Sequence, residues 1–192
     1  MDTIRHGVDP NGNPYVLMPS LDYQFMNDTD MGRLIGYIQS LEPVDNDPGE
    51  VRPGPIGRII ILDSSSGFVA AQQIDHASIE PMNDVEVAVS VEYGQYVSYT
   101  CTGCHSANFT GGPFPGAAPG DPPPSNLTPH ESGLADYTLE DFTGVIRNGI
   151  KPDGSVIDPQ FMPWNSLGQM TDTEIEALYL YLQSLDPLPY NS

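Results

Sequence analysis

Two stretches of the chain carry apolar residues three and four positions apart, which is the spacing of one buried stripe on a helix. The first stripe is formed by Met31, Leu34, Ile35, Ile38 and Leu41, and the second by Ile175, Leu178, Tyr179, Leu182 and Leu185. A capping box, Thr171-Asp172-Thr173-Glu174, begins the second segment, and Pro187 follows it as a stop. The pattern therefore predicts amphipathic helices over 28–41 and 172–185.

Apolar and aromatic residues between positions 91 and 99 predict a third helix, which ends in Cys101-Thr102-Gly103-Cys104-His105. Gly94 inside this helix costs about 1 kcal/mol relative to alanine. Such a glycine is tolerable where another helix crosses closely. We expect the 172–185 helix to be that crossing partner.

The region after the two cysteines is irregular and is followed by one more helix. Residues 110–129 are dominated by glycine and proline, which predicts a loop. Thr138 then caps a helix that continues to Arg147 and stops at Gly149. The elements predicted on either side of this loop are helices, and the all-α fold class is what the family resemblance described below implies.

Residues 4–43 repeat in residues 146–187. The first segment begins with Ile-Arg-His-Gly-Val-Asp-Pro-Asn-Gly and the second with Ile-Arg-Asn-Gly-Ile-Lys-Pro-Asp-Gly. The stretch before Met18 is two residues shorter than the stretch before Met162. From these methionines onward, the two segments align without gaps. The alignment pairs Met18-Pro19 with Met162-Pro163, Asp28 with Asp172, and Tyr37-Ile38-Gln39-Ser40-Leu41 with Tyr181-Leu182-Gln183-Ser184-Leu185.

The repeat and the composition divide the chain into three parts. Residues 1–43 hold the first copy of the repeat, and residues 89–192 hold the cysteine motif together with the second copy. Residues 44–88 are expected to be a connector, because their first part is rich in proline and acidic residues. Within that connector, 56–88 is a possible packing segment, and Ile59–Leu62 fits either a short strand or a buried helical turn.

Charge and hydropathy exclude several classes of protein. The chain has 6 Lys and Arg against 26 Asp and Glu, a formal charge of −20 that would repel nucleic acid and anionic lipid. The same field favours basic protein partners. No apolar run approaches the length of a membrane span. The first seven residues lack the apolar core of a signal peptide, so we expect that a leader was removed or lies upstream.

The sequence Cys101-Thr102-Gly103-Cys104-His105 has the spacing of a covalent haem site. Each thiol can add to one vinyl group of the porphyrin, and the adjacent imidazole then lies under the iron. His105 would be the proximal ligand. A thioredoxin-like redox pair or half of a zinc site are the alternatives. A zinc site would need two more ligands, and the sequence has no third cysteine.

The sixth iron position has four candidate ligands, namely Met162, Met170, Met82 and His130. Met162 is favoured because it precedes Pro163 in an extended stretch between two predicted helices. Met170 lies next to a helix cap and fits a core methionine. A thioether stabilises ferrous iron and raises the reduction potential, which suits electron transfer.

These features together resemble a class I bacterial cytochrome c domain. The resemblance covers residues 90–187 and includes the Cys-X-X-Cys-His motif, Asn126-Leu127-Thr128, the Arg-X-Gly-X-X-X-Asp-Gly stretch at Arg147, and Met162-Pro163-Trp164. It implies thioether anchors at Cys101 and Cys104, axial ligands His105 and Met162, and an all-helical fold. Arg147 and Trp164 occupy positions that could bind the haem propionates, and a surface charge for Arg147 and a core aromatic for Trp164 are the alternatives.

The resemblance also implies a function and a location. The chain would be an electron carrier rather than an enzyme, passing single electrons between redox partners in the periplasm or elsewhere outside the cytoplasm. A cytochrome subunit of a dehydrogenase complex is one alternative. A haem peroxidase, with His130 as acid or base, is another. Haem-based sensing and a purely structural cytochrome module also remain open.

The internal repeat extends the resemblance to tandem di-haem cytochromes with a truncated first domain. Residues 1–43 match only the second half of such a domain and hold no Cys-X-X-Cys-His. Three explanations are open: an open reading frame that starts late, a degenerate half-domain used for packing, or a haem supplied by another chain. We expect one covalent haem c per chain, and a partner or packing segment that covers residues 1–43.

Overall fold

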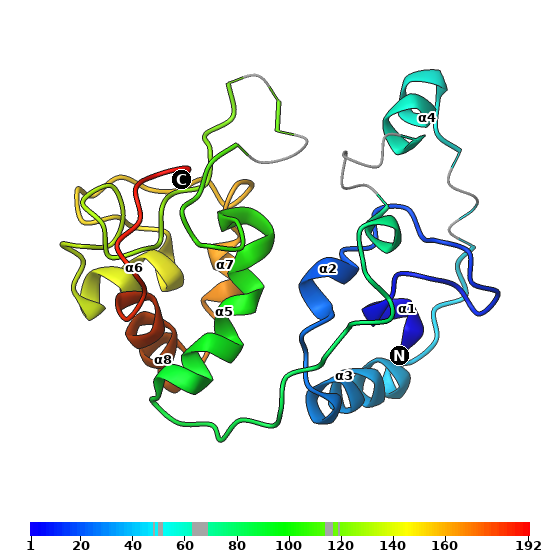
Figure 1. Cartoon of the computed structure of the whole chain (residues 1–192), viewed down its shortest axis with the longest axis horizontal. Helices are drawn as coiled ribbons and strands as arrows, with labels where there is room; N and C mark the ends of the chain where they lie inside the picture. The colour runs from blue at the N-terminus through cyan, green and yellow to red at the C-terminus, as the bar shows by residue number, and fades with distance from the viewer. Residues whose placement is uncertain (48, 50–51, 63–68, 114–116, 119) are drawn as a thin grey trace. The chain divides into compact units, whose positions relative to one another are not determined.

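The computed structural model describes residues 1–47, 49, 52–62, 69–113, 117–118 and 120–192 (Figure 1). In this part of the chain every regular element is a helix, and the β contacts are two isolated bridges, Val8 with Pro14 and Ile150 with Val156. The chain divides into two compact units, Met1–Asp84 and Val85–Ser192. The predicted all-α fold class is confirmed.

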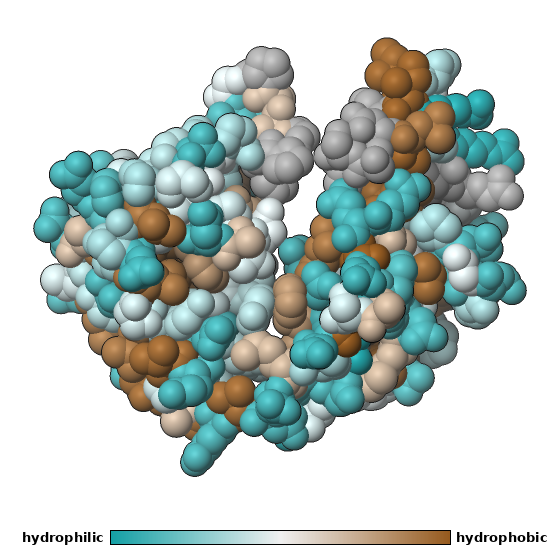
Figure 2. Space-filling model, in the orientation of Figure 1, coloured by the Kyte–Doolittle hydropathy of each residue, from teal (hydrophilic) through white to brown (hydrophobic). Residues whose placement is uncertain are grey.

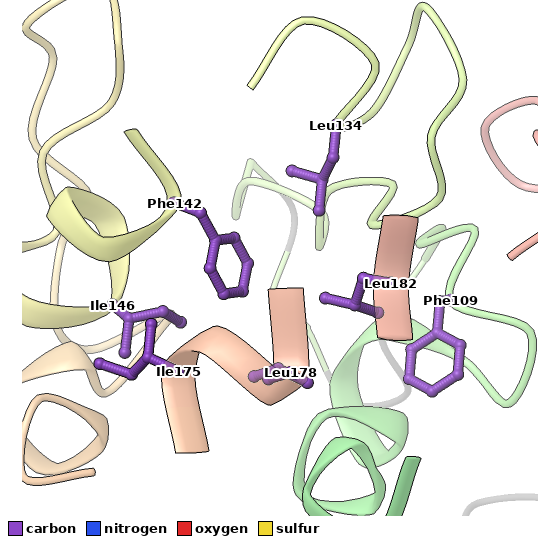
Figure 3. Packing of buried hydrophobic residues seen from close by; sticks show 7 residues of the cluster. All are labelled: Phe109, Leu134, Phe142, Ile146, Ile175, Leu178 and Leu182. Carbon is purple, nitrogen blue, oxygen red and sulfur yellow. The ribbon is translucent and has the colours of Figure 1, made fainter. Parts of the chain in front are cut away.

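Four helices build the second unit (Figure 1): α5 (Val91–His105), α6 (Leu139–Asn148), α7 (Trp164–Leu167) and α8 (Asp172–Gln183). α5 packs along α8, and α6 packs against α7 and α8. Their apolar side chains and those of the neighbouring loops meet in one core (Figure 3), formed by Phe109, Leu134, Phe142, Ile146, Ile175, Leu178 and Leu182. The core lies where α6 and α8 face each other, and it supports the helix that ends in the cysteine motif.

The crossing of α5 and α8 depends on a glycine. Gly94 is buried, and a Cβ atom built on it would overlap the backbone carbonyl of Ala177. Ala177 itself is fully buried. The two backbones therefore approach closely, and the prediction that another helix crosses at Gly94 is confirmed.

The long helices begin with the side-chain caps that the sequence predicts. The side chains of Thr138 and Thr171 accept hydrogen bonds from the backbone N–H three residues later, at the starts of α6 and α8. Asn27 caps α3 in the same way. The caps of α6 and α8 are complete capping boxes. α6 ends at Gly149, whose φ of 67° lies in the left-handed region.

The first unit consists of short helices packed against a segment distant in sequence. Its elements are α1 (Asp2–Arg5), α2 (Ser20–Tyr23), α3 (Asp28–Ser40), α4 (Pro55–Leu62) and the 3-10 helix η2 (Ala70–Gln72). α2 contacts both α1 and η2. Among the described residues of this unit, the buried apolar ones are Met31, Val69, Ala70, Ala71 and Ile74. Residues 69–74 thus supply most of its buried apolar side chains.

The boundary between the units differs from the one drawn from composition. The composition predicts a first part that ends at residue 43 and a connector that ends at 88, whereas the first compact unit extends to Asp84. Besides the packing of 69–74, Thr29 Oγ1 donates to the Asp84 carboxylate at 2.8 Å and Met82 N donates to the Phe25 carbonyl at 3.0 Å. Connector residues 48, 50–51 and 63–68 lie outside the described residues.

The repeat in the sequence is also a repeat in the structure. α1 corresponds to the last turn of α6, α2 to α7 and α3 to α8. Each copy holds one of the two isolated β-bridges. The glycines beside those bridges have matching φ angles, 66° at Gly7 against 67° at Gly149, and 84° at Gly12 against 81° at Gly154. Both copies therefore form the same sequence of turns.

Ile59 to Leu62 belong to helix α4, so of the two predicted alternatives the strand is wrong. The helix is not buried either, since Ile56, Ile59 and Leu62 are 75%, 70% and 82% exposed. Figure 2 shows this hydrophobic surface, in brown, on α4. Among the described residues, no helix combines the length and the apolar character needed to cross a bilayer.

Candidate functional site

The last turns of α5 present the cysteine motif. Ser90 caps this helix by accepting the N–H of Tyr93 at 3.1 Å, and the helix continues without a break to His105. Cys101, Cys104 and His105 are therefore spaced along the end of one helix, where positions three and four apart share a face. The cysteine motif, whose spacing predicted a haem site, therefore lies on one continuous helix. The crossing with α8 holds that helix in place.

His105 is oriented by a backbone carbonyl. Its Nδ1 lies 2.7 Å from the carbonyl oxygen of Ser125. Because a carbonyl can only accept, Nδ1 carries the proton, and Nε2 is left with the lone pair that a metal would bind. Burial lowers the pKa of His105, opposed in part by the hydrogen bond to Ser125. The neutral imidazole that ligation requires is therefore favoured.

The first thiol of the motif is also enclosed. Burial raises the pKa of Cys101 to about 11, with a smaller opposing effect from the Thr100 hydroxyl 3.8 Å away. The thiol is therefore protonated at neutral pH. Cys104 lies nearer to the surface than Cys101. The two sulfurs thus differ in environment, with Cys101 the more enclosed of the two.

One cavity in the second unit brings four of the predicted site residues together. It has a volume of about 250 Å³, and its wall includes Cys101, Cys104, His105 and Met162. The rest of the wall is mostly apolar and includes Phe142, Ile146, Leu178 and Leu182, four of the core residues drawn in Figure 3. Two thiols, an imidazole and a thioether on one apolar cavity are the donor set of a covalent haem with His/Met ligation, so the residues present fit that group.

Met162 is held in a tight turn before α7. Pro163, with φ −77° and ψ 57°, caps that helix, and the Met162 carbonyl accepts the N–H of Trp164 at 2.7 Å. The N–H of Met162 donates to the Asp158 carbonyl at 3.3 Å. Both backbone polar groups of Met162 are therefore satisfied locally. This leaves the side chain on the cavity wall.

The other candidate ligands are placed differently. Met170 lines the same cavity as Met162, so the geometry keeps it as an alternative thioether. Met82 belongs to the first unit. His130 is not part of the cavity wall, and its Nδ1 lies 2.9 Å from the Ser132 hydroxyl. The acid or base that a peroxidase would need near the iron is therefore not supplied by His130.

Arg147 and Trp164 make contacts within the protein, and neither lines the cavity. The guanidinium of Arg147 donates to the carbonyls of Gly168 and Met170 and to the Asp172 carboxylate. The Trp164 indole donates to the Ile157 carbonyl at 2.8 Å. Their proposed role at the haem propionates gains no support from these contacts and stays a prediction.

These contacts assign both residues to the support of the Met162 loop. Arg147 ties the end of α6 to the segment between α7 and α8. Trp164 packs on Gly149, where a Cβ atom would overlap the indole ring. The loop that presents Met162 is thus fastened from both sides.

Sequence reasoning missed a buried clamp behind His105. The side chains of Asn126 and Thr128 both donate to the Leu188 carbonyl, at 2.8 and 2.9 Å, and Thr128 N donates to Asn126 Oδ1 at 2.8 Å. Asn126 and Thr128 are 2% and 0% exposed. Because Ser125 directly precedes Asn126, the clamp fixes the carbonyl that His105 uses. Two small polar residues two positions apart were a visible signal, but their acceptor lies about 60 residues away.

Comparisons with known proteins agree with this geometry. The family model described as cytochrome c matches residues 91–186. The chain is 35% identical to the cytochrome c subunit of alcohol dehydrogenase (quinone) from Gluconobacter oxydans (strain 621H), over 63% of this chain and 24% of that protein. It is 31% identical to the fructose dehydrogenase cytochrome subunit from Gluconobacter japonicus, over 50% of this chain and 21% of that protein.

A third relative is the gluconate 2-dehydrogenase cytochrome c subunit from Pantoea cypripedii, 33% identical over 47% of this chain and 22% of that protein. The chain spans less than a quarter of the length of each of these relatives. The cytochrome c model matches half of the chain, including the whole cysteine motif. The chain belongs to the cytochrome c family.

Proposed function

We propose that this chain is the electron-transferring part of a cytochrome subunit that serves a dehydrogenase. Cys101 and Cys104 would hold the haem covalently, and His105 and Met162 would be the ligands of its iron. The observation that carries the proposal is the single cavity whose wall holds all four side chains. The relatives are cytochrome subunits of dehydrogenases, which supports the same assignment here. The chain carries electrons and does not itself oxidise a substrate.

Haem c, when bound, supplies a one-electron iron couple. The protein sets the properties of that couple through its own residues. The Ser125 carbonyl fixes the tautomer of His105 and increases the basicity of Nε2. The neutral Met162 thioether favours the ferrous state and leaves no open position for a substrate. The apolar wall excludes water, which also disfavours the more highly charged ferric state.

Charge and composition support the partners and the location. A formal charge of −20 favours redox partners that dock through basic surfaces. Covalent haem attachment places the mature protein in the periplasm or another compartment outside the cytoplasm. Both cysteines of the sequence lie in one motif, which supports one covalent haem per chain. Intact mass and a pyridine haemochrome assay measure that number, and two covalent haems per chain would contradict it.

The ligand assignment is tested with two matched variants, Met162→Leu and Met170→Leu. Both methionines line the cavity, and leucine conserves most of the volume in each case. The oxidised protein should show the weak methionine-to-iron band at the red end of the visible spectrum. We expect Met162→Leu to remove this band and lower the reduction potential, and Met170→Leu to keep both.

The variants separate the alternatives. Persistence of the band in Met162→Leu refutes Met162 as the ligand, and its loss in Met170→Leu alone assigns the other thioether. Rapid binding of carbon monoxide or cyanide by the unmodified protein would indicate an open iron and favour ligand-binding chemistry over electron transfer.

A further inference from the structure

Two cavities of the second unit share part of their walls, and Lys151 lines both. Beside the cavity of about 250 Å³ lies a second one of about 470 Å³, whose wall also includes Cys104, His105 and Met162. Lys151 is half-buried on the shared wall. The aliphatic stem of a lysine can pack on apolar side chains while its ammonium stays near water. A positive charge is therefore available beside the residues proposed to hold the haem.

This charge is rare in the chain. Lys151 is the only lysine, and among residues 85–192 the only arginine is Arg147. Haem carries two carboxylates, and a carboxylate next to an apolar wall needs a charged partner or water. Within the second unit, these two side chains are thus the lysine and arginine cations that a haem carboxylate could meet.

The guanidinium of Arg147 is engaged elsewhere. It donates to two backbone carbonyls and to the Asp172 carboxylate, and it lines neither cavity. Its counterpart in the first unit, Arg5, donates in the same way to the Asp28 carboxylate at 2.9 Å and to the Met26 carbonyl at 2.8 Å. Residues 1–84 contain no cysteine. The arginine therefore makes these bonds whether or not its own unit has a haem motif.

The position of Lys151 has the same backbone in both copies of the repeat but the opposite charge. Its counterpart in the first unit is Asp9. Lys151 N donates to the Ser155 carbonyl at 2.9 Å, and Asp9 N donates to the Asn13 carbonyl at 2.8 Å. The Asp9 carboxylate accepts the backbone N–H groups of Asn11 and Asn13, so it serves its own turn. The turn forms with either residue, and the positive charge occurs in the unit that has the haem motif.

We infer that the ammonium of Lys151 is the charged partner of one carboxylate of the bound haem. The inference rests on the proposed function, because it requires a haem at Cys101 and Cys104. It assigns to Lys151 part of the role that the sequence predicts for Arg147 and Trp164. A compact charge on a flexible stem can follow a carboxylate without a fixed bidentate geometry. The pair keeps that carboxylate ionised, and the positive charge near the iron favours the ferrous state.

Other titratable groups lie around the same cavities. Asp121 lines the larger cavity, and Tyr137 lines the smaller one. Hydrogen bonds from Ser155 lower the pKa of Asp153, and the charge of Lys151 adds to this effect. Burial raises the pKa of Tyr137, so its phenol is neutral at physiological pH. All of these groups are retained when Lys151 is replaced, so the difference from the parent isolates the lysine.

The test uses the full chain with its covalent haem, in which the carboxylate carbons of the haem carry an NMR-active carbon isotope. In the reduced, diamagnetic protein each labelled carbon gives a signal whose shift follows the ionisation of its carboxylate. We expect Lys151→Gln to raise the midpoint pH of one of the two signals by about one unit, a tenfold change in proton affinity. The same variant should lower the reduction potential at neutral pH, because a positive charge near the iron is lost.

Three variants serve as controls. Lys151→Arg keeps the charge and should retain the midpoints and the potential of the parent. Asp153→Asn removes a carboxylate close to the lysine and should not raise either midpoint. Arg147→Gln removes one positive charge from the other basic residue of the unit, and it should leave both midpoints close to those of the parent.

Several results would overturn the inference. These are unchanged midpoints or an unchanged potential in Lys151→Gln with its haem attached, or a raised midpoint in Arg147→Gln instead. A failure of the proposed function is visible separately. A chain without covalent haem gives no labelled signals from the protein, and loss of Met162 as ligand shows in the methionine-to-iron band of the parent.

Discussion

Replacing Gly94 by alanine should break the crossing that holds the haem-attachment helix in place. A Cβ at this position would overlap the backbone carbonyl of Ala177 and also contact Cβ of Tyr181. A backbone carbonyl inside α8 cannot rotate away as a flexible side chain can. The added methyl group must therefore push α5 and α8 apart, and with them the end of α5 that carries His105.

The magnitude follows from two opposing effects. Overpacking of this kind costs about 3 kcal/mol or more when the obstructing atom is backbone. Alanine gains roughly 1 kcal/mol over glycine in a helix interior. We therefore expect the free energy of unfolding of the second unit to fall by about 2 kcal/mol or more. With guanidinium chloride slopes of roughly 4 kcal/mol per molar, the midpoint should fall by about 0.5 M.

Gly36 provides the matched control. It lies inside α3, and a Cβ built on it meets no atom within 4 Å. Gly36→Ala should therefore leave the second unit unchanged and stabilise α3 by roughly 0.5 to 1 kcal/mol. Unfolding should be followed by the haem absorbance, which reports the second unit, and by far-ultraviolet circular dichroism. If Gly94→Ala is as stable as the parent by the haem signal, the close crossing is refuted.

Three further changes test the supports of the site. Thr128→Val removes one of the two donors to the Leu188 carbonyl, while Asn126 still donates to it, so we expect stability to fall by about 0.5 to 1.5 kcal/mol. The proton NMR shifts of His105 should change as well, and unchanged shifts would refute the clamp. Arg147→Gln loosens the segment at Met170, and the methionine-to-iron band should be lost at lower temperature than in the parent. Hydrogen bonds from Thr138 at the helix cap lower the pKa of Asp141 below its usual 3.8. Its contribution to stability is therefore present above pH 3.8 and is lost as the pH falls through the folded-state pKa. In Asp141→Asn the free energy of unfolding should depend less on pH in this range.

The sequence predicted those parts of the structure that depend on local patterns. The stripe at Ile175, Leu178 and Leu182 is buried, and the capping box at Thr171 begins α8. Gly94 implied a close crossing, because a glycine inside a helix needs a compensating contact. The cavity brings together Cys101, Cys104 and His105, whose spacing predicted one site, with Met162, the candidate ligand favoured for its place before Pro163.

The parts that escaped prediction depend on contacts between distant segments. In the second unit the Trp164 ring packs on Gly149, whereas in the first unit Ser20 lies on Gly7 and leaves more room. Residues 69–74 pack at that place, and the backbone N–H of Ala71 lies near Gly7. In the first unit, residues 69–74 occupy the space that corresponds to the Trp164 indole of the second unit. No local pattern in the sequence indicates that a segment about 50 residues away would do so. For the same reason 56–88 could not be assigned from composition.

Comparison of the two copies of the repeat distinguishes two requirements of a methionine loop. One set of contacts lets the loop form, and another lets its thioether bind. Gly7 and Gly149 take the same left-handed φ, and Pro19 and Pro163 the same turn, although in the part of the chain that the structure describes a long helix packs along α8 and none packs along α3. The loop geometry is therefore encoded by the loop and its arginine. Burial of the adjacent stripe requires a helix from elsewhere in the chain or outside it. A Met-Pro turn fastened by an arginine thus indicates where a thioether is presented, and the chemistry of the helix opposite decides whether it meets an iron.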